Sequence, residues 1–245
     1  MRASNSHSNR RLHNWLAYRM TDAWLDRNVG LIRGTLFDLG AGEAPYREYC
    51  ESHCNRYVAV DWSQSLHSVR ADIIADLNQP LPIASGSADV VLCISVLEHL
   101  HEPQGFLNEA ARILRDDGAL LLQVPFQWWV HEAPHDYFRY TPFALQLLLE
   151  RAGFAGVNIE PLRGFFSQWA LKANYFSARF IRGPRPVRCF ARCSLAPFWT
   201  IAQLLAPMLD RLDRDHRLET FGFAVTARRP PSGGVRLSSA ECPLS

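Results

Sequence analysis

Three aspartates each stand at or just after a short apolar run, and the first of them opens a glycine turn. Asp38 begins the segment Asp38–Gly42, in which Gly40 and Gly42 lack a Cβ and let the backbone turn tightly against a ligand. A dinucleotide-binding turn of the form G-x-G-x-x-G would need a third glycine where this chain has Pro45, which has no N–H. A carboxylate beside the turn suits instead a ligand that carries an ammonium and a sulfonium group. S-adenosylmethionine is such a ligand.

The other two aspartates fit further parts of the same ligand. Asp61 ends the run Tyr57–Asp61, and a carboxylate at the end of the second strand of a doubly wound sheet is placed to accept hydrogen bonds from both ribose hydroxyls. Asp76 lies in the third run, Ile73–Leu77, where it could accept from the adenine amine while Leu77 packs on the ring. The three positions, taken in strand order, predict a single cofactor site.

The chain from residue 36 to 154 resembles class I S-adenosylmethionine-dependent methyltransferases. The resemblance is carried by the phrases VLEHL at 96–100, LNEAARILRDDGALLLQVP at 107–125 and HEAPHDYFRYTPFALQLLLERAGF at 131–154. It implies an α/β fold with a doubly wound, Rossmann-like sheet of seven strands, of which the last is antiparallel. Residues 219–228 are the candidate for that last strand, and a helical insertion precedes it.

Two residues depart from the usual form of the glycine turn in this family. Ala44 replaces a third glycine step, and Ala41 stands where cysteine is common; both side chains are small enough to leave cofactor binding intact. With these substitutions accepted, the resemblance implies the following cofactor-binding residues: Asp38, Gly40, Ala41, Gly42, Asp61, Trp62, Asp76, Leu77 and Ser95.

The remaining elements follow from periodicity and capping. We expect an amphipathic helix over 12–28 that could cover the cofactor, a second helix over 103–114, and a third that Thr141 and Pro142 begin and Gly153 ends. The fourth, fifth and sixth strands are expected over 88–94, 119–124 and 157–162.

Glu98 and His99 follow the fourth expected strand and offer two interpretations. Some methyltransferases hold a divalent metal at this place with a Glu-x-x-Glu-His arrangement, but here the first position is Ser95, so we predict no metal. His99 is then either a proton-transfer residue or a histidine at a helix start whose ring bonds to the backbone.

The loop after the fifth expected strand is dense in acids, bases and aromatic rings. It leaves the carboxyl end of the strand, which in open α/β sheets faces the ligand. His135 is the preferred general base, with Glu132 or Asp136 to orient its ring, because imidazole titrates near neutral pH. Three aromatic residues of this loop could line the substrate site: Phe126, Trp128 and Trp129. The alternative is that residues 136–140 form a structural salt bridge and packing corner.

Residues 163–192 contain seven basic side chains and no acidic one, although the whole chain has a net charge of only +2. On a helix, aromatic residues of this region fall on one stripe with cations beside it, which is typical of a helix at a membrane interface. The uncharged stretch 195–209 is too short to span a bilayer and is interrupted by Pro197 and Pro207. Packing of two helices over the substrate cleft or against a second copy is the alternative. The low net charge and lack of a recognisable module disfavour nucleic acid.

Length and composition fit one enzyme domain. The 245 residues, 48% of them hydrophobic, predict a single domain over 1–229 with a helical elaboration at about 163–212 and a disordered tail over 230–245. Residues 1–9 are expected to be loose. The six cysteines form no C-x-x-C pair and are expected to be reduced thiols. The polar N-terminus has no apolar signal core, so the expected location is the cytoplasm, with peripheral contact at the inner membrane face through 163–212.

The combined prediction is an S-adenosylmethionine-dependent methyltransferase that methylates an oxygen of a small molecule or of a glycan or lipid-linked intermediate. Its predicted catalytic residues are His135, Glu132 and His99. The alternatives are a nitrogen or carbon acceptor, or a cofactor-binding regulator without turnover. A homodimer is a further expectation, and the acceptor itself cannot be read from the sequence.

Overall fold

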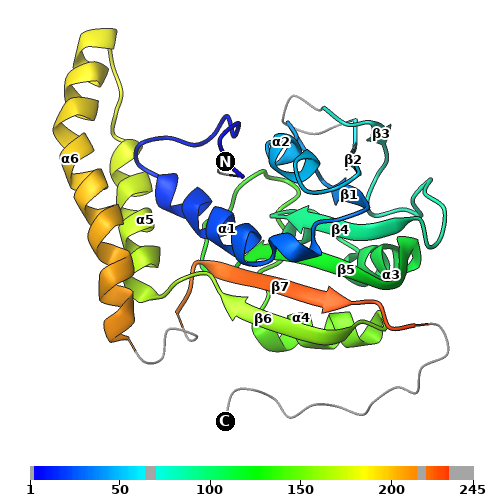
Figure 1. Cartoon of the computed structure of the whole chain (residues 1–245). Coiled ribbons are helices and arrows are strands. Elements are labelled where there is room, and N and C mark those ends of the chain that lie inside the picture. The colour runs from blue at the N-terminus through cyan, green and yellow to red at the C-terminus, as the bar shows by residue number, and fades with distance from the viewer. Residues whose placement is uncertain (1–2, 64–69, 214–218, 232–245) are drawn as a thin grey trace.

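Seven strands of the described chain form one sheet in the order β3-β2-β1-β4-β5-β7-β6 (Figure 1). The computed structural model describes residues 3–63, 70–213 and 219–231. All pairings from β3 to β5 are parallel, whereas β7 is antiparallel to both β5 and β6. This confirms the predicted α/β class and the antiparallel last strand. The strands are β1 Thr35–Leu39, β2 Arg56–Asp61, β3 Ile73–Ile74, β4 Ala88–Ile94, β5 Leu114–Pro125, β6 Ala155–Pro161 and β7 Gly222–Arg228.

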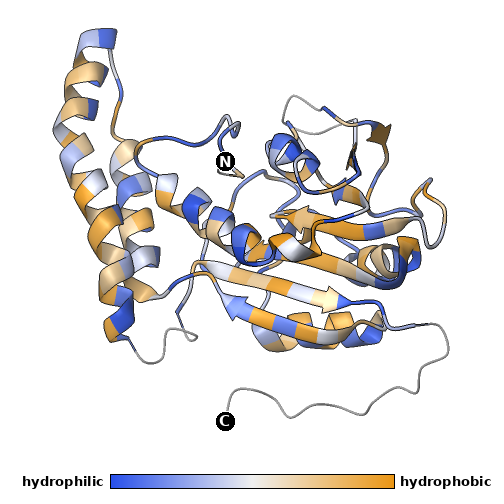
Figure 2. Cartoon of the chain, in the orientation of Figure 1, coloured by the Kyte–Doolittle hydropathy of each residue, from blue (hydrophilic) through white to orange (hydrophobic). Residues whose placement is uncertain are grey.

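Helices cover both faces of this sheet because side chains of each strand alternate between the two sides. In β1, Phe37 and Leu39 pack in one core with α3 and α4, while Leu36 packs in the other with α1, α2 and α5. Figure 2 shows the apolar strands between these helices. The helices are α1 Trp15–Arg27, α2 Arg47–Glu51, α3 Pro103–Ile113, α4 Pro142–Arg151, α5 Phe165–Ala178 and α6 Arg185–Leu209, with short 3-10 turns η1 Val29–Leu31, η2 Leu97–His99 and η3 Asp210–Leu212.

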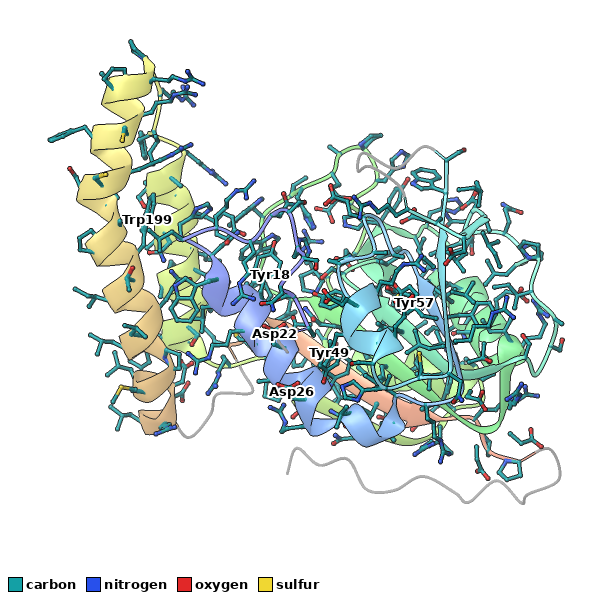
Figure 3. All side chains as sticks on the ribbon, turned by 45° about the horizontal axis from the view of Figure 1, so that its top comes forward. Tyr18, Asp22, Asp26, Tyr49, Tyr57 and Trp199 are labelled. Carbon is teal, nitrogen blue, oxygen red and sulfur yellow. The ribbon has the colours of Figure 1, made fainter. Side chains whose placement is uncertain are left out.

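Helix α1 is anchored on one side by α2. The hydroxyl of Tyr49 donates to Asp26 at 2.8 Å, and Figure 3 shows the two residues where α2 meets α1. The predicted start of α4 is also confirmed, because the Thr141 side chain accepts from the amide of Ala144 and Pro142 is the first helical residue.

Helices α5 and α6 lie side by side at one edge of the molecule, with α6 outermost (Figure 1). They are held together by polar contacts such as that of Trp199 Nε1 with Ser177 Oγ at 2.8 Å. The expected interruption by Pro197 and Pro207 is wrong, since both lie inside α6. The expectation that this region is too short to span a bilayer also needs correction, because the continuous helical stretch Arg185–Leu212 is long and apolar enough to do so by length and composition. Pro197 cannot donate to the carbonyl of Cys193 one turn earlier, but both residues are exposed, so water can satisfy that carbonyl.

Three other expectations need correction. Ala3 and Ser4 are buried rather than loose, because Ser4 donates from its amide and its hydroxyl to Asp22 on α1, whereas Asn5, Ser6, Ser8 and Asn9 are exposed. Strand β5 begins at Leu114, five residues before its expected start, because Arg115–Gly118 continues the strand instead of ending a helix. Strand β3 is limited to Ile73–Ile74. The five described cysteines are free thiols, as expected, and the tail over 232–245 lies outside the described residues.

Candidate active site

A cavity of about 620 Å³ opens where the parallel strands end, which is the ligand-binding edge of an open α/β sheet. The cavity is lined by every residue that the sequence assigned to the cofactor or to catalysis. From the cofactor set these are Asp38, Gly40, Ala41, Gly42, Asp61, Trp62, Asp76, Leu77 and Ser95, and from the catalytic set His99, Glu132 and His135.

The glycine turn after β1 has the geometry that its sequence requires. Gly40 has a φ of +83° and lies so close to the segment after β4 that a Cβ would be 2.4 Å from a methyl of Val96. Gly42 has a φ of +56°, and its amide donates to the carboxylate of Asp61. The turn is therefore fixed between β4 and β2, with its backbone toward the cavity.

Asp38 is a buried acid beneath this turn. Burial is the largest influence on its carboxyl and raises its pKa to about 7; the hydroxyl of Tyr57, which donates to it, acts in the opposite direction. The negative charge of Asp61 raises the pKa further, and Arg47 lowers it. A buried carboxyl of this kind would be stabilised in its ionised form by a cationic ligand.

The other two acids of the cofactor set are oriented by backbone amides. Asp61 accepts from Trp62 at 2.7 Å as well as from the turn, and Asp76 accepts from the amide of Asn78 at 2.9 Å. Leu77 is buried beside them. Both acids line the cavity.

Helix α1 closes one side of the cavity, as expected, and brings residues that the sequence did not single out. Tyr18 and Thr21 line the cavity, and the Thr21 hydroxyl donates to Gln123 of β5 at 2.7 Å. The segment before α1 contributes further lining residues, among them His7 and His13. The N-terminal sequence is polar and has no hydrophobic periodicity, so it did not predict that this segment would line the cavity. The segment is held there by the buried contact between Ser4 and Asp22.

A cluster of aromatic residues also lines the cavity. Trp128 and Trp129 are stacked with ring centroids 3.9 Å apart, and Tyr175 of α5 meets Trp129 edge-on at 4.6 Å. The two tryptophans line the cavity as predicted, whereas Phe126 packs into the core against Phe223. Tyr175 is a lining residue that the sequence missed, because nothing in its helix identifies the face that meets the loop.

His135 lines the cavity, but its partners differ from those expected. Its Nδ1 is 3.1 Å from the hydroxyl of Tyr137, and its ring meets Trp62 edge-on at 5.2 Å. The ring is therefore positioned by Tyr137 rather than by Asp136. Among the described residues, no carboxylate contacts the ring of His135.

Asp136 instead belongs to a structural corner, the alternative that the sequence left open. Arg139 binds both of its oxygens, at 2.6 and 2.8 Å, and the amide of His131 donates to it. Burial acts to raise the pKa of Asp136, but these contacts together outweigh it and lower the pKa to about 2. The corner is tied to the segment after β4, because the amides of Tyr137 and Phe138 both donate to the carbonyl of Glu98.

His99 has the backbone contact that was the alternative to proton transfer. Its Nδ1 lies 2.8 Å from the carbonyl of His135, and burial is the main cause that lowers its pKa. Beside it, Glu98 is fully buried, and burial raises the pKa of its carboxyl to about 8. Neither oxygen of Glu98 has a hydrogen-bond partner among the described residues.

Comparison with known proteins agrees with this geometry. Residues 37–122 match the family described as "Methyltransferase domain". A protein of Mycobacterium tuberculosis named "Probable S-adenosylmethionine-dependent methyltransferase" is 27% identical over 96 residues, which cover 37% of this chain and 35% of that protein. The "Ubiquinone biosynthesis O-methyltransferase" of Pseudomonas paraeruginosa is 24% identical over 113 residues, which cover 40% of this chain and 47% of that protein.

The fold comparison covers more of the chain. A crystal structure of an S-adenosylmethionine-dependent methyltransferase from Archaeoglobus fulgidus matches with a TM-score of 0.53 and 15% identity, over 86% of this chain and 93% of that one. The matched residues 37–122 resemble a methyltransferase domain, and the relatives in sequence and in fold include proteins named as S-adenosylmethionine-dependent methyltransferases. The sequence matches span less than half of the length of either relative.

Proposed function

We propose that this chain transfers the methyl group of S-adenosylmethionine to an oxygen of a small molecule or of a glycan or lipid-linked intermediate. The observation that carries the proposal is one cavity with two halves. One half is lined by the carboxylates and the glycine turn after β1 and β2, and the other by Trp128, Trp129 and the loop that carries His135. A methyl donor and an acceptor can therefore meet without leaving the cavity.

The residues of the first half fit the cofactor. Asp38 offers a buried carboxyl to a cationic group, the backbone at Gly42 lies open to a ligand, and Asp61 offers acceptors for ribose hydroxyls. When bound, S-adenosylmethionine supplies a methyl group that moves to the acceptor oxygen while the electron pair of the broken C–S bond returns to sulfur. The tasks of the chain are then alignment of the acceptor, exclusion of water and removal of the hydroxyl proton.

His135 is the residue proposed to take that proton. Its ring is held by the hydroxyl of Tyr137 and the edge of Trp62, and Trp62 belongs to the cofactor half. Glu132 and His99 stand behind it on the cavity wall, with the Glu132 carboxylate 3.9 Å from His99 Nε2. The O-methyltransferase among the relatives supports oxygen as the acceptor atom.

A lipid-linked acceptor is favoured by the surface of α5 and α6. The predicted aromatic stripe is exposed: Phe165, Trp169 and Phe176 of α5, and Phe180 just after it, have between 39% and 69% of their surface accessible. The outer face of α6 adds exposed Phe198, Ile201, Leu205 and Met208. By length and composition, the helical stretch Arg185–Leu212 is also apolar enough to cross a membrane, and only 17% of its most apolar window is buried.

The charge of this surface fits an anionic membrane rather than a neutral partner. The apolar residues are accompanied by cations of 163–192, and no acid lies in that stretch. The pair of helices α5 and α6 also reaches the acceptor half of the cavity. Tyr175 of α5 lines the cavity, and Arg179, just after α5, lies 5.3 Å from the centre of the Trp129 ring. We therefore propose peripheral binding at the cytoplasmic face of the inner membrane, with the cavity mouth near the lipid headgroups.

The decisive experiment has two stages. Mass spectrometry of small molecules that co-purify with the chain should find S-adenosylmethionine or S-adenosylhomocysteine. A screen of hydroxylated, glycosylated and lipid-linked acceptors should then release S-adenosylhomocysteine in proportion to methylated product. Cofactor binding without release for any acceptor would support the regulatory alternative, and methylation at nitrogen or carbon would overturn the oxygen assignment.

A further inference from the structure

Glu98, His99 and His131 meet on the cavity wall although they come from two separate segments. Glu98 and His99 belong to η2, which follows β4, and His131 belongs to the loop that follows β5. One potential ligand atom from each residue lies within 4.8 Å of the others. All three residues line the cavity.

The carboxylate of Glu98 is the first sign that this cluster binds a ligand. Its side chain is fully buried, and neither oxygen has a hydrogen-bond partner among the described residues. Its backbone carbonyl is instead the group that receives the amides of Tyr137 and Phe138. A buried polar group without a partner is costly, and buried carboxylates are normally paired or bound to a metal.

The hydrogen bonds of His99 leave one ring nitrogen available as a metal ligand. A carbonyl only accepts, so the 2.8 Å contact of Nδ1 with the His135 carbonyl places the ring proton on Nδ1 and the lone pair on Nε2. That Nε2 is 3.7 Å from Glu98 Oε1 and 3.9 Å from Glu132 Oε2. A backbone carbonyl behind the ring is the usual partner of a metal-binding histidine.

His131 is held in a similar way. Its Nδ1 lies 3.3 Å from both the carbonyl of Trp129 and the carboxylate of Asp136, and 3.4 Å from the guanidinium of Arg139. These contacts occupy Nδ1 and leave Nε2 as the nitrogen that can bind an ion, and the ring centroid is 4.8 Å from that of His99. Each histidine thus has an oxygen partner behind it and a free nitrogen.

We propose that Glu98, His99 and His131 form a binding site for a divalent first-row transition ion. Two imidazole nitrogens with one carboxylate favour zinc, manganese, iron or cobalt over magnesium, which prefers oxygen ligands alone. Three protein ligands leave a coordination position toward the cavity, which Glu132 or an acceptor oxygen could fill. Binding of the ion does not depend on the proposed methyl transfer. Only a role of the ion toward the acceptor rests on that proposed function.

No metal was predicted from the sequence because Ser95 stands where a metal-binding Glu-x-x-Glu-His segment has its first acid. That prediction included only Glu98 and His99 as further ligands. His131 lies more than thirty residues further along the chain, so its position in the cluster follows from the tie between the loop and Glu98.

Metal binding is tested without cofactor or acceptor. Full-length protein freed of metal with a chelator is titrated with Zn²⁺, Mn²⁺, Co²⁺ and Mg²⁺ in a calorimeter, and bound metal is counted by mass spectrometry after dialysis. We expect one transition ion per chain and much weaker binding of Mg²⁺. The Co²⁺ form should show an absorption spectrum that changes when one imidazole ligand is lost.

Three variants locate the site. Glu98→Gln and His131→Ala should each weaken binding at least about tenfold, while His101→Ala, which changes an exposed histidine two residues from His99, should bind as the parent does. Circular dichroism checks the fold, and His131, being partly exposed, gives a second variant if Glu98→Gln is unstable. No transition-ion binding by the parent, or equal affinity in a folded His131→Ala variant, would overturn the proposal.

Discussion

The hydroxyl of Tyr57 on β2 donates a hydrogen bond to the buried carboxyl of Asp38 on β1, and this bond opposes the effect of burial on the pKa of Asp38. The pKa nevertheless stands at about 7, so Asp38 is largely protonated in the free protein below that pH. A cationic cofactor favours the ionised form, and binding below pH 7 must therefore release a proton.

The first prediction follows from this proton release. Affinity for S-adenosylmethionine should fall as the pH is lowered below about 7, by up to about tenfold per pH unit. Tyr57→Phe removes the bond that lowers the pKa, so the same fall should begin at a higher pH. Calorimetric titration across this range measures both effects. Asp38→Asn should flatten the profile, and a parent affinity that does not change with pH would contradict the assignment.

The second prediction concerns the ribose contact. Asp61→Ala removes two charge-assisted hydrogen bonds worth roughly 1.5–3 kcal/mol each, so cofactor affinity should fall at least tenfold. Because Asp61 also receives the amides of Gly42 and Trp62, a thermal melt must show that the variant is folded. Glu48→Ala, an exposed acid on α2, is the matched control and should bind normally. Unchanged affinity in folded Asp61→Ala would remove Asp61 from the site.

The third prediction separates catalysis from binding at His135. With an acceptor in hand, His135→Ala should lower turnover by about 10²–10⁴-fold and change cofactor affinity little. Tyr137→Phe, which removes the contact to Nδ1, should cause a smaller loss in turnover. The measurement is the rate of S-adenosylhomocysteine release, with the exposed His53→Ala as control. Turnover within a few-fold of the parent would make His135 structural, like the neighbouring Asp136–Arg139 corner.

The fourth prediction concerns the exposed surface of α5 and α6. Each cation near an anionic membrane contributes about 1 kcal/mol, and the attraction is screened over about 10 Å at 0.1 M salt. The chain should therefore float with anionic vesicles at low salt and be released at high salt. Lys172→Glu with Arg179→Glu should weaken binding, whereas the exposed pair Arg56→Glu with Arg151→Glu should not.

The apolar face of α6 gives this test a second arm. Ile201→Ser with Met208→Ser should reduce vesicle binding without changing the fold, because both side chains are more than half exposed. If the surface instead joins two copies of the chain, sedimentation should show a dimer that these variants dissociate. A dimer that does not float at low salt would rule out the membrane.

Much of the cofactor half could be predicted from the sequence because its residues are tied to strand ends. Asp38, Asp61 and Asp76 each lie at or just after an apolar run, and parallel strands bring their carboxyl ends to one edge. Periodicity likewise predicted the exposed stripe of α5, and Thr141 with Pro142 predicted the start of α4. These are local signals that depend on few distant contacts.

The acceptor half was decided by contacts between segments far apart in the sequence. The amides of Tyr137 and Phe138 both donate to the Glu98 carbonyl. These two hydrogen bonds, which no sequence motif predicts, hold the loop so that His131 lies beside Glu98 and His99. Tyr175 reaches the cavity because α5 packs against the loop, and Asp136 pairs with Arg139 instead of orienting His135. Loop conformation and helix docking depend on such long-range contacts, and a local pattern of residues does not encode which partner each side chain finds.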